Sequence, residues 1–267
     1  MFITVRKDKD MSKCKQRAEV LSQKEIAPGI HDLLLMPEKP VQADPGTFVA
    51  LFPKDPSTLL MRPISVCEQK EDGALRLVYR VAGKGTGEFS RLGSGDCLMM
   101  LGVLGNGFPT DLKGRKITLM AGGIGIPPML GTLKALCENN DTNVILGYRN
   151  SDLFLKEDFD RYGRVIVATE DGSAGIRGNV VDALRSMEEQ PEIIMACGPM
   201  PMLAAIKRYA GEKGIRAYIS LEERMACGVG ACLGCVTKTA RVDGHSHVKN
   251  ARVCTEGPVF DAEEVDI

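Results

Sequence analysis

The sequence predicts a β plus α/β protein: an antiparallel β-barrel, then a Rossmann-like domain with a parallel sheet, then a small cysteine-rich segment. Three observations predict this order. Short strand-like runs separated by glycine and proline fill residues 1–111, apolar strands alternate with helical patterns over 112–221, and four cysteines cluster within 222–267. We therefore predict domain boundaries near residues 111 and 221.

Length and composition narrow the functional class. The chain has 267 residues, of which 44% are hydrophobic, and a formal net charge of −1. A near-neutral chain lacks the concentrated basic face that nucleic acid requires, so nucleic acid is not an expected partner. The first residues show no apolar signal-peptide region, and no apolar run reaches the roughly 18 residues of a membrane-spanning helix. We expect a cytoplasmic protein that does not bind membranes.

The first region consists of predicted strands. Each run is short, rich in aliphatic residues and bounded by turn residues, and a short helix is indicated only around Glu88–Leu92. Many short strands of this kind favour an antiparallel barrel. The runs are AEVLSQKEIA, HDLLLMP, GTFVALFP, ISVCEQ, ALRLVYRVA and DCLMMLGVLG.

From Lys116 onward, apolar strands alternate with helical patterns. Helices are predicted at about Pro127–Glu138, Asn179–Met187 and Met200–Gly211. This alternation indicates a parallel sheet with helices on both faces. The strands are ITLMA, NVILGY, RVIVATE, EIIMACG and IRAYISL.

Four of the nine cysteines form the strongest functional signal. Cys227, Cys232 and Cys235 lie in CGVGACLGC, and Cys254 follows after a longer gap. This is the spacing of plant-type [2Fe–2S] ferredoxins, in which a tight loop directs several thiolates at two irons. Glycines at 228, 230 and 234 allow sharp turns that present backbone N–H groups to the sulfurs. The segment is too short for a good core of its own, so we expect the cluster to organise it.

Two other metal sites are alternatives. Zinc usually takes its ligands as two close pairs, and Cys254 has no near partner in the sequence. A Rieske site would use histidines, and His245 and His247 are available, but four cysteines already supply a full ligand set. We expect both histidines to be exposed loop residues.

Two glycine-containing turns follow predicted parallel strands. AGGIGIPPM contains Gly122, Gly123, Gly125 and Pro128, and there the chain could turn tightly and admit a pyrophosphate at a helix start. The motif departs from the full G-x-G-x-x-G pattern, so a plain strand–turn–helix connection is the alternative. ACGPMPM places Cys197, Gly198 and Pro199 at another strand end, where ligands of parallel sheets bind. Cys197 either faces a ligand or is a buried thiol.

The barrel region contains two candidate anchors for a flavin nucleotide. In Arg62, Pro63, Ile64 and Ser65, the arginine could supply charge and the serine a hydrogen bond to a phosphate. VYRVAGKGTGEFS offers an aromatic residue, an arginine and a glycine-rich turn, for which an ordinary hairpin is the alternative.

Together these motifs resemble the ferredoxin–NADP⁺ reductase superfamily over nearly the whole chain. That resemblance implies a flavin-binding barrel followed by a nicotinamide domain. The RPIS, GGIGIPP and CGP segments match the flavin and nicotinamide motifs of the superfamily. The resemblance also implies FAD contacts at Val78, Tyr79, Arg80, Gly85 and Thr86.

The C-terminal motifs narrow the resemblance. SLEERMACGVGACLGCV and VCTEGPVF are similar to the electron-transfer subunits of class 1B dihydroorotate dehydrogenases. Such a subunit would bind FAD and one [2Fe–2S] cluster, use NAD as substrate, and join an FMN-containing catalytic subunit in a heterotetramer with two of each chain. Rival interpretations are a subunit of an NAD(P)H–ferredoxin oxidoreductase or soluble hydrogenase, and a zinc-stabilised binding module.

Two further features bear on this resemblance. Thr47 stands where relatives commonly carry glutamine, which leaves the flavin anchors unaffected, and residues 1–10 look like an extension. After the third predicted parallel strand, Glu170 and Asp171 supply two carboxylates where NADP-using relatives tend to carry serine and arginine. Carboxylates there should repel a 2′-phosphate, which predicts NAD over NADP.

Overall fold

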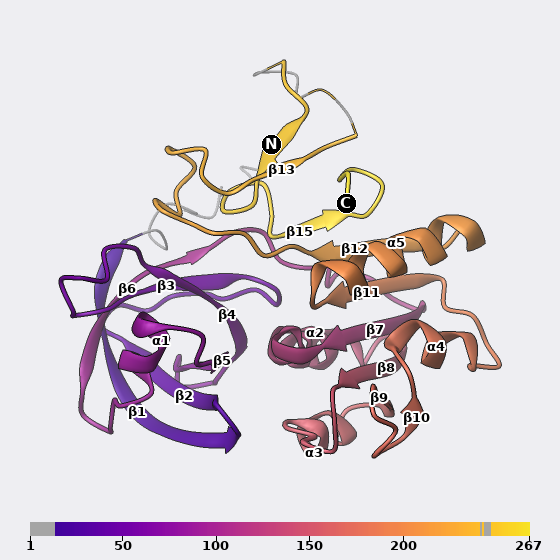
Figure 1. Cartoon of the computed structure of the whole chain (residues 1–267), viewed down its shortest axis with the longest axis horizontal. Helices are drawn as coiled ribbons and strands as arrows, with labels where there is room; N and C mark the ends of the chain where they lie inside the picture. The colour runs from indigo at the N-terminus through magenta and orange to yellow at the C-terminus, as the bar shows by residue number, and fades with distance from the viewer. Residues whose placement is uncertain (1–13, 241, 243–246) are drawn as a thin grey trace, which may run out of the picture.

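The computed structural model describes residues 14–240, 242 and 247–267. It has three parts: a barrel, a helix-covered sheet beside it, and a C-terminal segment that lies across the top of both (Figure 1). The possible extension at residues 1–10 and His245 lie outside the described residues.

The barrel is closed and antiparallel, in the strand order β1-β2-β5-β4-β3-β6. Alternate strand residues such as Leu33, Leu35 and Leu77 point inward and are fully buried, as the period of two requires. The short helix α1 (Lys84–Phe89) directs the ring of Phe89 into this core. The strands are β1 (Lys15–Ala27), β2 (Ile30–Pro37), β3 (Phe48–Phe52), β4 (Arg62–Gln69), β5 (Leu75–Arg80) and β6 (Cys97–Leu104).

The second part is a seven-stranded sheet in the order β10-β9-β8-β7-β11-β12-β15. Its neighbours are parallel except at β15, which pairs antiparallel with β12 at one edge. The strands are β7 (Lys116–Gly122), β8 (Asp141–Tyr148), β9 (Arg164–Thr169), β10 (Ile176–Arg177), β11 (Ile193–Cys197), β12 (Arg216–Ser220) and β15 (Val259–Asp261).

Helices cover both faces of this sheet. Successive residues of a strand contribute to opposite cores: Leu119 packs with α2 (Ile126–Leu136) and α3 (Lys156–Asp160), and Met120 with α4 (Val180–Arg185) and α5 (Met200–Lys213). Strands buried on both faces consist of continuous apolar runs, and for this reason they could be predicted from the sequence. After β7 a single turn of 3-10 helix, η1 (Gly123–Gly125), leads into α2.

The barrel and the sheet share one apolar core. Ile30, Cys67 and Val78 of the barrel pack in the same cluster as the residues of α2. Helix α2 approaches strand β4 closely, because a Cβ on Gly131 would lie 2.7 Å from the Cys67 carbonyl oxygen. This contact fixes how the two parts face one another.

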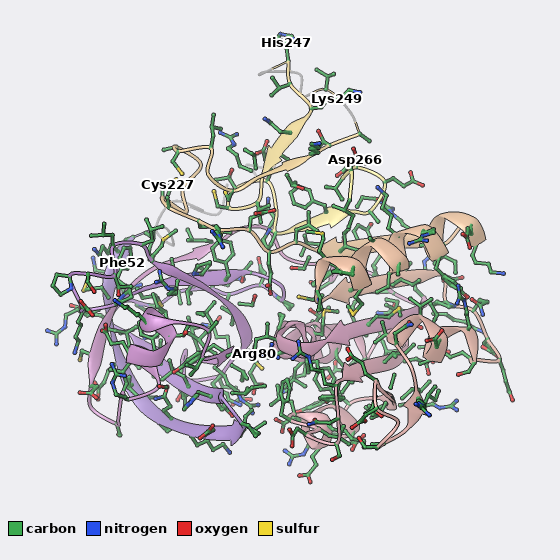
Figure 2. All side chains as sticks on the ribbon, viewed as in Figure 1. Phe52, Arg80, Cys227, His247, Lys249 and Asp266 are labelled. Atoms are coloured by element: carbon green, nitrogen blue, oxygen red, sulfur yellow. The ribbon has the colours of Figure 1, made fainter. Side chains whose placement is uncertain are left out.

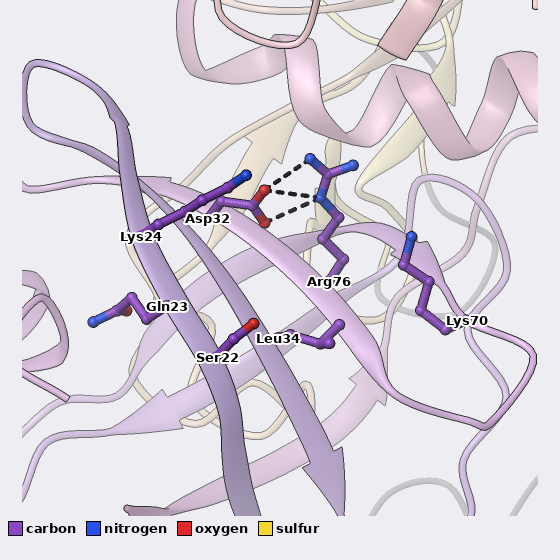
Figure 3. A pocket seen from close by; sticks show the side chains of 7 residues that line it. All are labelled: Ser22, Gln23, Lys24, Asp32, Leu34, Lys70 and Arg76. Carbon is purple, nitrogen blue, oxygen red and sulfur yellow. Dashed lines mark hydrogen bonds and ion pairs between the residues drawn. The ribbon is translucent and has the colours of Figure 1, made fainter. Parts of the chain in front are cut away.

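An ion-pair network borders that core. Arg76 of β5 donates to Asp32 at 2.7 Å and to Asp158 of α3 at 3.0 Å, and Glu68 of β4 pairs with Arg76 and with Lys134 of α2. Figure 3 shows the Asp32–Arg76 pair beside a small hollow of about 320 Å³ on the barrel. The network therefore joins three barrel strands to two helices of the α/β part.

The C-terminal segment is attached at several points. A small hairpin, β13 (Val236–Lys238) with β14 (Asn250–Arg252), precedes β15, and Val253, Phe260 and Val265 pack in the core beneath α5. The amide of Asn106, just after β6, donates to the carbonyls of Thr255 and Glu256 at 3.0 and 3.1 Å. The segment thus shares a core with the rest of the protein, and the expectation that a cluster organises its cysteine loop stays a prediction.

The fold class is confirmed, with differences at short elements. The helix indicated around Glu88–Leu92 begins earlier, at Lys84. The sequence analysis missed α3, β10, the β13–β14 hairpin and β15, each of five residues or fewer. At that length periodicity carries almost no signal, and pairing with distant partners decides the structure.

Candidate functional site

A cavity of about 930 Å³ lies where the barrel meets the carboxyl ends of the parallel strands. The barrel contributes Ala27, Pro28, Ile30 and Arg80 to its wall, the C-terminal segment contributes Glu222, and the α/β part contributes the rest. Arg80 is labelled at this junction in Figure 2. The carboxyl edge of an open parallel sheet is where nucleotides bind, and this cavity has the size of a ligand site.

The two glycine motifs meet in this cavity. Strands β7 and β11 are parallel neighbours with Ala121 opposite Cys197, so their following turns lie side by side. A Cβ on Gly125 would clash with the Cys197 and Gly198 backbone, so only glycine permits this approach. Gly122, Gly123, Gly125, Gly198 and Pro199 all line the cavity, and Pro128 is buried in the first turns of α2.

Cys197 has a different position from its neighbours. Its side chain is 1% exposed within the core shared by α2 and the sheet, and it does not line the cavity. Burial raises the pKa of the thiol to about 12, with a smaller contribution from Glu222, while Ser220 lowers it. The structure therefore favours the buried strand-end thiol over a side chain that faces the nicotinamide.

The predicted flavin anchors of β4 and α1 also lie together. A Cβ on Gly85 would come within 2.7 Å of Arg62 Nε, so the guanidinium packs directly on the α1 backbone. Arg62 Nη1 donates to the carbonyls of Leu60 and Met61 at 2.6 and 3.2 Å. The Thr86 hydroxyl accepts from the backbone amide of Ala82 at 2.9 Å and shapes the turn before α1. Pro63, Ile64 and Ser65 continue along β4, of which Ile64 points into the barrel.

The next three anchors alternate along β5. Val78 faces the core shared with α2, and Arg80 lines the cavity. Tyr79 points into the barrel, where its hydroxyl donates to Gln23 at 2.8 Å and its ring stacks on His31 at 5.7 Å. The side chain of Tyr79 is 1% exposed, so it forms part of the barrel core and only its backbone could meet a cofactor.

Sequence reasoning missed several cavity residues, and Glu222 is the most informative. It follows β12, lies in the cavity and interacts with Arg80 of the barrel. Burial raises the pKa of the Glu222 carboxyl, and the positive charge of Arg80 acts in the opposite direction. Its position after a strand end was the available signal. Five more cavity residues were not predicted, although they also lie at or near the ends of strands or the starts of helices: Gly147, Tyr148, Arg149, Asn179 and Met202.

The two carboxylates after β9 differ in their surroundings. Glu170 lines the cavity. Asp171 instead accepts from the Ser173 hydroxyl and backbone amide at 2.6 and 2.9 Å, which lowers the pKa of its carboxyl. Glu170 is therefore the carboxylate that a bound nucleotide would meet.

The four clustered cysteines come together as two interacting pairs. Cys227 interacts with Cys232, and Cys235 interacts with Cys254. Burial, together with the neighbouring Cys235 thiol, raises the pKa of Cys254 to about 12. Burial acts in the same direction on Cys227, but backbone N–H groups of Val229, Ala231 and Cys232 and the Cys232 thiol lower its pKa to about 6. The protein thus supplies donors for a thiolate at Cys227.

The loop backbone explains these donors. Gly228 and Gly230 have φ of +70° and +82°, so successive N–H groups point inward and form an anion-binding concavity. The third left-handed residue is Leu233, at φ +56°, rather than Gly234, and the Gly234 amide donates to Cys232 Sγ at 3.4 Å. A left-handed leucine is a strained conformation, retained only where the surrounding structure requires it.

These residues fit a binuclear cluster. Among the described residues, no three His, Cys, Asp or Glu side chains converge on one point as a single metal ion would require. The four thiols would together supply the full ligand set of a [2Fe–2S] centre. His247, the Rieske candidate within the described residues, is exposed.

Comparison with known proteins agrees with this geometry. A family model described as the iron-sulfur cluster binding domain of dihydroorotate dehydrogenase B matches residues 222–266, and an oxidoreductase NAD-binding domain matches 119–208. The dihydroorotate dehydrogenase B (NAD(+)) electron transfer subunit of Streptococcus mutans is 40% identical over 94% of this chain and 98% of its own length. This chain belongs to that family.

Other members of the family are equally similar. The electron transfer subunit of Listeria monocytogenes serovar 1/2a is 41% identical over 93% of this chain and 98% of its own length. The matches confirm the expected iron–sulfur and nicotinamide parts and the oxidoreductase class.

Solved structures show the same fold. A structure titled for the NADH-dependent reduced ferredoxin-NADP oxidoreductase has a TM-score of 0.80 and 29% identity, covering 93% of this chain and 89% of that one. A flavohemoglobin from Malassezia yamatoensis with bound FAD and heme has a TM-score of 0.66 at 16% identity, covering 75% of this chain and 57% of that one. The barrel is thus of the FAD-binding ferredoxin reductase type. No helix among the described residues is long and apolar enough to span a membrane.

Proposed function

We propose that this chain passes electrons from the FMN of a dihydroorotate dehydrogenase catalytic subunit, through [2Fe–2S] and FAD, to NAD⁺ in cytoplasmic pyrimidine biosynthesis. The observation that carries the proposal is the attachment of the cysteine loop to both nucleotide-binding parts. Met61 of the barrel packs against Gly228, and β15 joins the edge of the nicotinamide sheet. The proposed units are 1–111 for FAD, 112–221 for NAD and 222–267 for the cluster.

The chemistry requires three groups in this order. A nicotinamide exchanges a hydride, a cluster takes single electrons, and a flavin exchanges either. The protein's task is to hold and orient these groups. We assign the nicotinamide nucleotide to the cavity walled by Gly122, Gly125 and Gly198, and the flavin to the barrel face with Arg62 and Arg80. Glu222 sits beside Arg80, where the two sites adjoin.

An apolar surface beside the cysteine loop supports a protein partner. Leu59 and Leu60 are 87% and 50% exposed, and Val229 and Leu233 are 46% and 61% exposed. The loops that carry them abut, because a Cβ on Gly228 would lie 2.5 Å from the Met61 side chain. Exposed apolar patches of this kind mark interaction sites. We assign this surface to the FMN-containing catalytic subunit and propose a heterotetramer with two copies of each chain.

The ferredoxin oxidoreductase alternative shares the fold, as the similarity at a TM-score of 0.80 shows. Identity is 29% to that structure and 40% to the dihydroorotate dehydrogenase B relatives, which favours the proposed function.

The test is reconstitution. The isolated chain should reduce dyes with NADH and leave dihydroorotate unoxidised. Adding the catalytic subunit should couple dihydroorotate oxidation to NAD⁺ reduction. Stable co-purification without coupling, or dihydroorotate oxidation by the chain alone, would contradict the proposal.

A surface variant tests the docking site. Leu59→Asp should weaken binding of the catalytic subunit by at least about tenfold, because a charge would be buried in an apolar contact, and it should leave NADH–dye activity intact. Tyr162→Asp, at an exposed apolar position just after α3, is the control. Equal affinity of both variants for the catalytic subunit would contradict the assignment of this surface as the docking site.

A further inference from the structure

Thr255 follows Cys254, the proposed fourth cluster ligand, and its hydroxyl has no acceptor among the residues that the structure describes. Among the described residues, the buried side-chain atoms without a hydrogen-bond partner are Thr255 Oγ1, Thr118 Oγ1 and Gln16 Nε2. A buried hydroxyl left unpaired destabilises the fold, so native proteins rarely retain one without a partner.

The surroundings of this hydroxyl point to the cluster. A Cβ on Gly230 would lie 3.2 Å from Thr255 Oγ1 and 2.9 Å from its Cγ2, so the side chain packs under the cysteine loop. The N–H of Gly230 in turn donates toward the Cys254 sulfur. Thr255 therefore occupies the same corner of the site as Cys254 and the loop between Cys227 and Cys232.

The backbone holds Thr255 firmly in this place. Its amide donates to the Arg252 carbonyl at 3.1 Å, and its carbonyl accepts from Asn106 Nδ2 at 3.0 Å. Asn106 also donates its own amide to the Gly257 carbonyl at 2.7 Å. These contacts fix the backbone of Thr255, and its side chain lies close to Gly230 of the cysteine loop.

We propose that the Thr255 hydroxyl donates a hydrogen bond to a sulfur of the [2Fe–2S] centre at the Cys254 corner and raises its reduction potential. Reduction adds negative charge, which spreads over the sulfurs, so a donor stabilises the reduced form more than the oxidised form. In this role Thr255 changes the reduction potential of the cluster without ligating iron. The inference rests only on the cluster itself, so it can be tested without the catalytic subunit.

The experiment is a redox titration of the purified chain, followed by EPR of the reduced cluster. Thr255→Val should keep full iron and sulfide and shift the cluster to a more negative potential. The expected change is about tenfold in its reduction equilibrium, or ~59 mV for one electron. Thr255→Ser should restore the parental value.

Thr118→Val is the matched control, because it removes another buried, unpartnered hydroxyl within β7, outside the cysteine segment, and should leave the potential unchanged. If Thr255→Val loads less iron than the parent, Thr255→Ala replaces it in the comparison. An unshifted potential in a fully loaded Thr255→Val or Thr255→Ala protein overturns the proposal. A shift that Thr255→Ser fails to restore does so too.

Discussion

The nucleotide-binding body and the cysteine segment are stabilised in different ways. The barrel and the sheet have large cores of their own, share the α2 interface, and are joined by the Arg76 and Glu68 ion pairs. The segment from residue 222 has short strands, exposed loop residues and a core borrowed from α5 and the sheet. From this difference we expect the loop that carries Cys227, Cys232 and Cys235 to depend on metal for its order, and the barrel and sheet to fold without it.

The largest expected effect is on the metal. Cys232→Ala should abolish the cluster and increase protease cleavage between residues 226 and 252, because the loop then loses its organising centre. The barrel and the sheet should stay folded, because each has an apolar core that contains none of the four clustered cysteines. Strand β15 should stay paired with β12 at the sheet edge. Iron and sulfide analysis with limited proteolysis measures this, and Cys137→Ala, which removes a half-buried thiol at the C-cap of α2, is the control.

Two outcomes would break the comparison. The proposed [2Fe–2S] cluster would be contradicted by stoichiometric zinc in place of iron, found both in protein prepared in air and in protein prepared without air. Global unfolding of Cys232→Ala would show that the body also depends on the metal.

The next effect concerns the ion pairs of the body. Burial raises the pKa of Glu68, but hydrogen bonds from Lys134, Lys70 and Arg76 outweigh it and lower the pKa to about 2. A depressed carboxyl pKa stabilises the fold above the unfolded value near 4.5, and that contribution is lost as pH falls toward 2. Glu68→Gln should therefore lower the free energy of unfolding at pH 7 by about 3 kcal/mol.

Urea unfolding between pH 7 and pH 3 measures this effect. The free energy of unfolding should fall less between pH 7 and pH 3 in Glu68→Gln than in the parent. Glu71→Gln, which changes an exposed carboxylate, should behave like the parent. Equal pH profiles for all three proteins would show that this network contributes nothing to the body.

The smallest effect concerns the choice of nicotinamide. The parent should prefer NADH over NADPH in kcat/KM with a dye by at least about tenfold, because Glu170 faces the cavity. Glu170→Gln should narrow that preference roughly threefold, and Glu157→Gln, on the exposed side of α3, should leave it unchanged. A preference for NADPH in the parent would contradict the assignment.

Much of this architecture follows from local pattern. The apolar runs around Leu119 and Ile194 are buried on both faces, and the cysteine spacing is local, so both are visible in the sequence. The direction of Tyr79 was not visible, because it depends on which barrel face its strand turns inward. Glu222 and β15 were missed because they acquire meaning only when the chain returns to the cavity and to the sheet edge. Leu233 takes the left-handed conformation that local reasoning gave to a glycine.

The central claim is that electrons between the catalytic subunit and NAD⁺ pass through the cluster on this chain. The most direct test compares the parental and Cys232→Ala proteins, each assembled with the catalytic subunit, in dihydroorotate–NAD⁺ and NADH–dye assays. Loss of the cluster should abolish the first activity and spare most of the second, because the nucleotide-binding body remains folded. Dihydroorotate–NAD⁺ activity that persists in a complex shown to contain no iron would contradict the claim.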